Sequence, residues 1–317
     1  MADLHGLIAL HGREGAKQLV ADSERRLVDL AANVMESESE TGITYSGFCL
    51  TSLPHRQIDP TAIWERPGEN LTLVVMPGTL RINGKTTQFG VPFGSRARMI
   101  LLYLQSQAQR TGSPEVELGR SMRDWMLRMN VPLGGKSRDL VREQANRLSA
   151  CNLTFFYHGE EGEGFEKDSI IKSGFRFAHT PESDQPHPWV DCVKLGDVFF
   201  KAMMSSPVPL RESAVREISG KSMALDIYVW LAYLLPNLKA DKMVEWSALY
   251  RQFGAGFEEA RVFKRCFIEP LNTALAVYPE AKLRMLDRGL MLSPSRMPVE
   301  SKIHLVQAIE GQGNLNL

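Results

Sequence analysis

The sequence has few cysteines, no long hydrophobic run and no excess of charge of either sign. No stretch approaches the roughly 18 uninterrupted apolar residues of a membrane span, and the charged first thirty residues lack the apolar core of a secretory signal. We therefore expect a cytoplasmic protein with no membrane partner. The four cysteines, Cys49, Cys151, Cys192 and Cys266, form no CxxC pair, which argues against a disulfide framework and a zinc ribbon.

Catalytic motifs are also lacking. The seven histidines include no pair two or four residues apart, the spacing that binds the metal of nicking initiators. Residues 135–137 and 220–222 each read Gly-Lys-Ser, like the end of a phosphate-binding loop, but Asn130 and Val215 stand where its first glycine is required. We expect no enzyme activity, no cofactor and no metal. Strand nicking remains the alternative from another functional class.

The charge that is present is unevenly distributed. The 317 residues carry 37 basic and 37 acidic side chains, so any surface for nucleic acid must be local. Residues 94–151 hold ten Lys and Arg against five Asp and Glu, whereas residues 1–60 hold five against nine. The length predicts two domains plus an extension. The extension is acidic, and the positive charge lies in the middle of the chain.

Residues 61–180 are predicted to form the first domain. The Asn83-Gly84 pair predicts a hairpin near its start, and Ser121 stands at capping-box spacing before Asp124. The expected elements that follow are helices at 95–109, 121–129 and 136–150, then β-rich stretches at 153–158 and 169–178 with an acidic loop at 159–168 between them. Helix, helix, turn, helix and hairpin is the order of a winged-helix domain.

Residues 181–295 repeat this order. The expected elements are helices at 222–235, 246–253 and 258–277, then a hairpin of 282–285 and 290–292. Pro270 is expected to kink the third helix or end it early. We therefore predict an α+β protein of two tandem winged-helix domains. An acidic helical extension at 1–60, with one peripheral helix from Ala16 to Met35, precedes them, and a tail at 296–317 follows.

The third helix of each domain is expected to present basic side chains to DNA. In the first domain we assign Arg142 and Asn146 to base edges, because Arg binds guanine and Asn binds adenine bidentately in the major groove, and Lys136, Arg138 and Arg147 to phosphates. The predicted set also includes Ser137 in the first domain and Arg251, Arg261, Lys264, Arg265, Lys282, Arg284 and Arg288 in the second. A merely solvated helix face is the competing interpretation, since Asp139 and Glu143 can pair with Arg142 and Arg147.

An ordered series of short motifs runs along the chain. The motifs are Leu53-Pro54-His55-Arg56, Trp64-Glu65-Arg66, Pro77-Gly78, the string from Gly90 to Arg98, Leu118-Gly119-Arg120-Ser121-Met122, and Gly134-Gly135 followed by Leu140-Val141-Arg142-Glu143-Gln144 and Arg147-Leu148. In this order they resemble the plasmid-encoded Rep initiator family of theta-replicating plasmids, over about residues 50–290. Each motif alone is weak, and the specificity lies in their succession.

The resemblance implies a bacterial plasmid replication initiator that binds iteron direct repeats in double-stranded DNA at the origin. It implies opening of adjacent A·T-rich DNA and recruitment of the host initiator and replicative helicase. It also implies a monomer in equilibrium with a homodimer, formed through the first domain, that represses its own gene and limits plasmid copy number. Two winged helices can span successive major grooves about 34 Å apart, which fits a direct repeat. A winged-helix transcriptional repressor without a replication role is the alternative.

Overall fold

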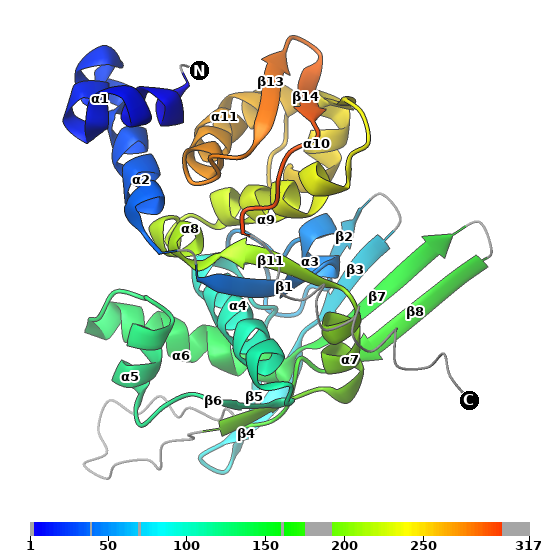
Figure 1. Cartoon of the computed structure of the whole chain (residues 1–317). Coiled ribbons are helices and arrows are strands. Elements are labelled where there is room, and N and C mark those ends of the chain that lie inside the picture. The colour runs from blue at the N-terminus through cyan, green and yellow to red at the C-terminus, as the bar shows by residue number, and fades with distance from the viewer. Residues whose placement is uncertain (1–2, 39, 69–70, 160–161, 175–191, 300–317) are drawn as a thin grey trace, which may run out of the picture.

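The computed structural model describes residues 3–38, 40–68, 71–159, 162–174 and 192–299. Figure 1 shows two lobes with a short two-stranded sheet between them, and the N-terminal helices lie beside the upper lobe. Across these ranges, no helix is both long and apolar enough to cross a membrane. Helices and strands are mixed along the whole described chain.

The lower lobe combines three helices with a three-stranded antiparallel sheet. In chain order these are α4 (Gly94–Thr111), β6 (Glu115–Glu117), α5 (Met122–Arg128), α6 (Gly135–Ala150), β9 (Ile171–Ser173) and β10 (Cys192–Leu195). The sheet order is β6-β10-β9, so the last strand lies in the middle. The three predicted helices are confirmed. Residues 175–178 of the predicted stretch 169–178 lie outside the described residues.

The upper lobe has the same order of elements. It contains α9 (Ser222–Asn237), β12 (Lys242–Glu245), α10 (Trp246–Phe253), α11 (Ala260–Ala276), β13 (Lys282–Leu286) and β14 (Gly289–Ser293). Its sheet order is β12-β14-β13, again with the last strand in the middle. The same arrangement of helices and strands thus occurs twice, and the predicted helices and hairpin of this half are confirmed.

Helix α11 runs through Pro270 and ends at Ala276, so Pro270 does not end it early, and the alternative that it kinks the helix stays a prediction. A proline inside a helix removes one hydrogen bond. Tertiary packing offsets that loss here, because Phe267, Leu271 and Ala274 on either side of it are fully buried.

Several local sequence signals are confirmed in the backbone. The Ser121 hydroxyl accepts a hydrogen bond from the Asp124 backbone N–H and caps α5. The hairpin of β4 (Gly78–Ile82) and β5 (Lys85–Phe89) turns at Asn83 and Gly84, whose φ angles of 49° and 76° suit a tight type I′ turn. These are short-range effects, which is why the sequence alone predicts them.

A second, four-stranded antiparallel sheet flanks the lower lobe (Figure 1). Its strands, in spatial order, are β2 (Trp64–Pro67), β3 (Leu71–Met76), β7 (Asn152–Gly159) and β8 (Gly162–Asp168). The acidic stretch predicted as a loop at 159–168 is therefore mostly strand, and it pairs with β7 in place of the stretch that follows. Phe165 lies opposite Phe156 across the two strands, with ring centres 6.0 Å apart. Such cross-strand pairing overrides the low strand propensity of the sequence.

The N-terminal segment contains two main helices, where one was predicted. These are α1 (Leu4–Leu19) and α2 (Arg25–Glu36), separated by the extended residue Val20 and the short helix η1 (Asp22–Glu24). Val28, Ala31 and Ala32 of α2 are fully buried, and α2 packs on α11. The segment is helical as expected, but α2 is not peripheral. Its apolar stripe is wide enough to join the core of the upper lobe.

Strand pairing also crosses the predicted domain boundaries. β1 (Thr41–Tyr45) pairs with β11 (Pro207–Arg211) to form the sheet between the lobes, and β10 pairs with strands of the lower lobe. The remaining helices are α3 (Gly47–Leu50), α7 (Asp197–Ser205) and α8 (Glu212–Glu217). The division at residues 60, 180 and 295 stays a prediction, and residues 300–317 of the predicted tail lie outside the described residues.

Candidate nucleic-acid interface

The first half of α6 is the exposed part of that helix. Gly134 precedes it with a φ of 154°, and no side chain caps the helix N-terminus. The first backbone N–H groups therefore lack a side-chain partner, and the helix dipole places partial positive charge there. Lys136 and Arg138 are exposed beside them, whereas the Ser137 hydroxyl oxygen is buried and has no hydrogen-bond partner within the described ranges. The helix N-terminus and the two exposed cations can bind an anion such as a DNA phosphate.

Arg142 lies one turn further along α6 and is half-buried. Its Nη1 is 3.3 Å from Oδ1 of Asp139, the i,i+3 pair that the competing interpretation requires. An exposed pair of this kind contributes little stability, so the guanidinium can exchange the carboxylate for another acceptor. The geometry is compatible with both a base contact and a solvated helix face.

The second half of α6 is covered, contrary to the prediction that Asn146 and Arg147 present their side chains to DNA. These two residues are only 4% and 6% exposed. α6 packs against α4 on one side and against the β4–β5 hairpin on another, so more than one face of the helix is covered. A Cβ atom on Gly78 of this hairpin would overlap the Ala150 carbonyl. In this conformation Asn146 and Arg147 do not face a surface that DNA could reach.

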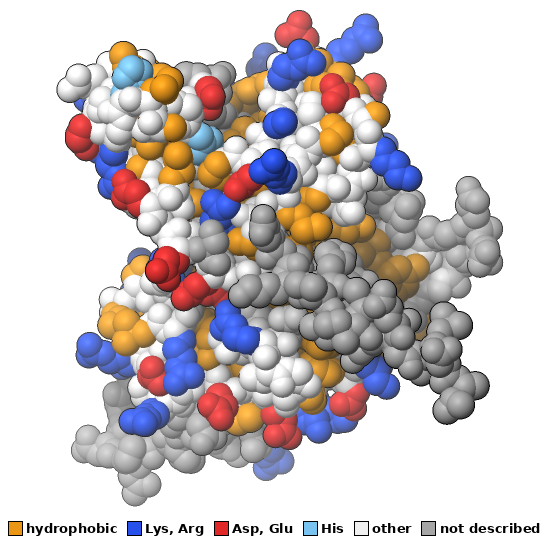
Figure 2. All heavy atoms as spheres, viewed as in Figure 1, with side chains coloured by type: hydrophobic (Ala, Val, Ile, Leu, Met, Phe, Trp, Pro, Cys, Tyr) orange, Lys and Arg blue, Asp and Glu red, His pale blue; other side chains and the backbone are white. Residues whose placement is uncertain are grey.

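The upper lobe exposes a larger set of cations. Phe263, Phe267 and Leu271 bury one face of α11, while Arg261 and Arg265 lie one turn apart on the exposed face. The other exposed cations of the predicted set are Arg251 at the end of α10, Lys282 and Arg284 on β13, and Arg288 at the hairpin turn. On the face in Figure 2, Lys and Arg side chains gather at the top of the molecule, where Figure 1 places the β13–β14 hairpin.

Lys264 differs from these cations because it is held in place. Its Nζ lies 4.8 Å from the centre of the Trp246 ring and 3.2 Å from the Asp287 carbonyl oxygen. These contacts join α11 to the first residue of α10 and to the hairpin turn. Lys264 therefore fixes the elements that carry the exposed arginines, and its own charge is partly used within the protein.

Sequence reasoning gave no role to the residues that join the two lobes. Arg98 on α4, Asp226 on α9 and Arg66 on β2 are largely buried, and each contacts the opposite lobe. Arg98 lies within the quoted string from Gly90 to Arg98, among the apolar positions of α4. The position of Arg98 in an apolar stripe was the one signal in the sequence that it has a buried partner, because charged residues are buried only when they are paired.

The described residues contain no group of three or more His, Cys, Asp or Glu side chains that could hold a metal ion. All four cysteines are free thiols, and burial raises the pKa of Cys151 to about 12. A thiol with so high a pKa stays protonated at neutral pH and is a poor nucleophile.

Residues 91–249, about half of the chain, match the family model for plasmid encoded RepA protein. The chain belongs to this family, which confirms the resemblance seen in the sequence motifs and supports a role in plasmid replication. The matched range runs from just before α4 into α10, so it includes Arg98 and Asp226 of the junction between the lobes.

Solved structures give weaker matches. A crystal structure of domains 2 and 3 of RctB has a TM-score of 0.49 at 11% identity, covering 80% of this chain and 99% of that one. Another structure of RctB domains 2–3 has a TM-score of 0.46 at 12% identity, covering 77% and 93%. No curated protein matches the sequence.

Proposed function

We propose that this protein is a plasmid replication initiator whose two lobes are winged-helix domains that bind direct repeats in double-stranded DNA. The observation that carries the proposal is the doubled arrangement, in which each lobe combines three helices with a three-stranded sheet that has its last strand in the middle. A helix of this kind fits the major groove, and a hairpin beside it can contact the backbone. Family membership supports the replication role.

The two lobes would contribute differently. In the upper lobe, Arg261 and Arg265 are exposed on one face of α11, and the cations of β13 and the turn lie close to that helix in the chain. In the lower lobe only the first half of α6 is exposed, with Lys136, Arg138 and the half-buried Arg142. We infer that the upper lobe reads bases over most of a helix face and that the lower lobe mainly anchors phosphates.

The wider family role completes the proposal. Many copies bound to repeated sites would supply the several kcal/mol needed to deform and open adjacent A·T-rich DNA, without nucleotide hydrolysis. The proposal also includes recruitment of host replication proteins and repression of the initiator's own gene by a dimer. Both rest on the family resemblance.

A maintenance assay tests the proposed function. The gene and its upstream DNA are placed on a vector that cannot replicate by itself, and the number of stable transformants is counted. We expect maintenance with the wild-type gene and its loss with the Arg261→Ala, Arg265→Ala double variant. Arg25→Ala, which changes an exposed arginine of α2, serves as the matched control and is expected to behave as wild type. Specific DNA binding without maintenance would favour the repressor alternative.

A further inference from the structure

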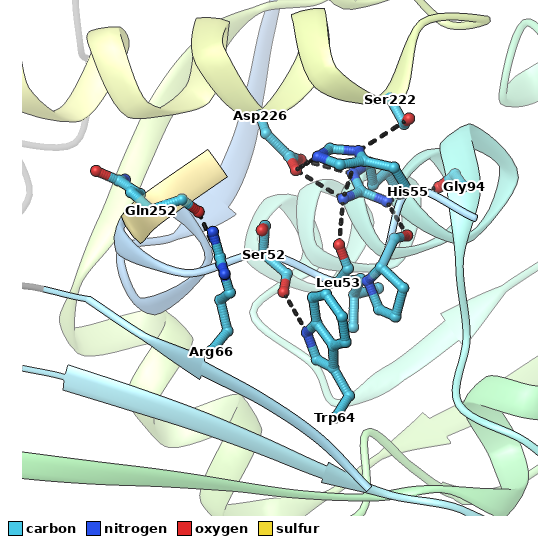
Figure 3. Close-up of polar contacts among 11 residues, drawn as sticks. Ser52, Leu53, His55, Trp64, Arg66, Gly94, Ser222, Asp226 and Gln252 are labelled. Carbon is cyan, nitrogen blue, oxygen red and sulfur yellow. Dashed lines mark hydrogen bonds and ion pairs between the residues drawn. The ribbon is translucent and has the colours of Figure 1, made fainter. Parts of the chain in front are cut away.

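A buried ion pair joins the first helix of one lobe to the first helix of the other. Nε and Nη2 of Arg98 on α4 each lie 2.6 Å from one carboxylate oxygen of Asp226 on α9 (Figure 3). The same guanidinium donates to the carbonyl oxygens of Leu53 at 2.7 Å, Gly94 at 2.9 Å and Pro54 at 3.2 Å. Arg98 is only 6% exposed, so all of its nitrogens are held in one geometry.

Two further hydrogen bonds cross the same junction. His55 Nδ1 lies 3.0 Å from the Ser222 hydroxyl at the start of α9. Arg66 Nε donates to the Gln252 carbonyl oxygen at 2.7 Å, near the C-terminal end of α10, where a cation also meets the negative end of the helix dipole. Figure 3 shows these two contacts on either side of Asp226. The upper lobe is thus held at two of its helices.

Buried apolar side chains surround the pair. Leu101 of α4 and Leu225 and Val229 of α9 line the junction beside Arg98, and all three are buried. A two-point pair of arginine and carboxylate is directional, because both hydrogen bonds must keep their geometry at once. A buried pair of this kind adds little net stability over apolar packing, and its better attested effect is to specify one arrangement.

We propose that the Arg98–Asp226 pair is a positioning contact that fixes the distance and rotation between the two DNA-reading lobes, and so sets the half-site spacing that one chain accepts. The proposal rests on the function proposed above. Each base pair added between half-sites moves the second one by about 3.4 Å and turns it by roughly 34°. Lobes held in one relative orientation cannot move with the shifted half-site, whereas lobes joined by a weaker contact can.

Binding to spacer variants tests the proposal. The probe is the duplex that the full chain selects from a library of random sequences, with zero, one or two base pairs inserted between its two protected halves. For wild type we expect two inserted base pairs to weaken binding at least about tenfold. For Asp226→Asn we expect less than about threefold, with each isolated half bound as by wild type. Asp22→Asn makes the same chemical change at an exposed pair of the extension and should keep the wild-type profile.

The outcomes distinguish failure of the positioning role from failure of the proposed function. An unchanged spacer profile in Asp226→Asn overturns the positioning role, while selection of no duplex by wild type overturns the proposed function and this inference with it. Asp226→Glu keeps the carboxylate and is expected to restore part of the spacing discrimination, which a merely destabilising substitution would not explain. Circular dichroism checks the fold, and if Asp226→Asn does not fold, Arg98→Lys carries the same test because it keeps the charge and loses the two-point geometry.

Discussion

The guanidinium carbon of Arg147 lies 5.0 Å from the centre of the Phe93 ring, where the second half of α6 meets the residue before α4. Its Nη1 donates to the Val91 carbonyl oxygen at 3.1 Å, and its Nη2 lies 2.8 Å from Glu143 Oε1. The side chain therefore ties the segment before α4 to α6. An arginine bound in this way fixes the position of α6 relative to α4.

Arg147→Ala is expected to destabilise the protein by about 2–3 kcal/mol, because it removes the stacking on Phe93 and leaves the Val91 carbonyl without its donor. Urea unfolding measures this change. The salt dependence of DNA binding, measured on the folded variant, should stay as in wild type. A slope lower by about one unit would instead show that Arg147 contacts a phosphate.

Arg265→Ala is expected to weaken binding to the selected duplex by about 1–3 kcal/mol and to relax the preference at one base position. The reason is that Arg265 is exposed on α11 opposite the buried face formed by Phe263 and Phe267. Fluorescence anisotropy with single-base variants of the duplex measures both effects. Arg25→Ala is the control, and equal losses in the two variants would contradict a base contact.

Lys136→Ala is expected to weaken binding to all sequences alike and to lower the salt slope by about one unit, because Lys136 lies beside the uncapped N-terminus of α6. Arg142→Ala should cost about 1–3 kcal/mol and affect one base position. Titrations at several salt concentrations distinguish the two patterns. Wild-type behaviour of both variants would favour the interpretation of α6 as a solvated helix.

His55 is expected to make stability depend on pH. Burial lowers the pKa of His55 to about 4, and the positive charges of Arg98, Arg66 and Arg56 contribute to this lowering. The Asp226 carboxylate acts in the opposite direction and raises the pKa. Between about pH 6.5 and 4 the unfolded chain binds a proton that the folded chain does not, so stability falls as the pH drops through this window.

The expected loss at pH 5 is on the order of 2 kcal/mol relative to pH 7. Urea unfolding of wild type and His55→Gln at both pH values measures it, because the variant removes only this titration and keeps a neutral polar side chain. Parallel pH dependence in the two proteins would contradict the prediction.

Local features of the fold were predictable from the sequence because they depend on neighbouring residues. The cap at Ser121, the turn at Asn83-Gly84 and the apolar periodicity of α4, α6 and α11 are of this kind. The covered half of α6 was not predictable, because the β4–β5 hairpin that covers it packs from a distant part of the chain.

The ion pair that joins the lobes could not be predicted from the sequence. Arg98 and Asp226 are 128 residues apart, and the residues around each of them do not indicate that the two side chains pair. The cations of the upper lobe were predictable because a basic helix face opposite aromatic residues is a local pattern. The structure was needed to show which of the predicted cations are exposed.

Hydroxyl-radical footprinting of the selected duplex tests the central claim most directly, namely that one chain carries two DNA-reading units in tandem. We predict two protected patches about one helical turn apart. Lys136→Ala should weaken protection of one patch, and Arg265→Ala should weaken protection of the other. A single patch that both variants affect equally would contradict the account.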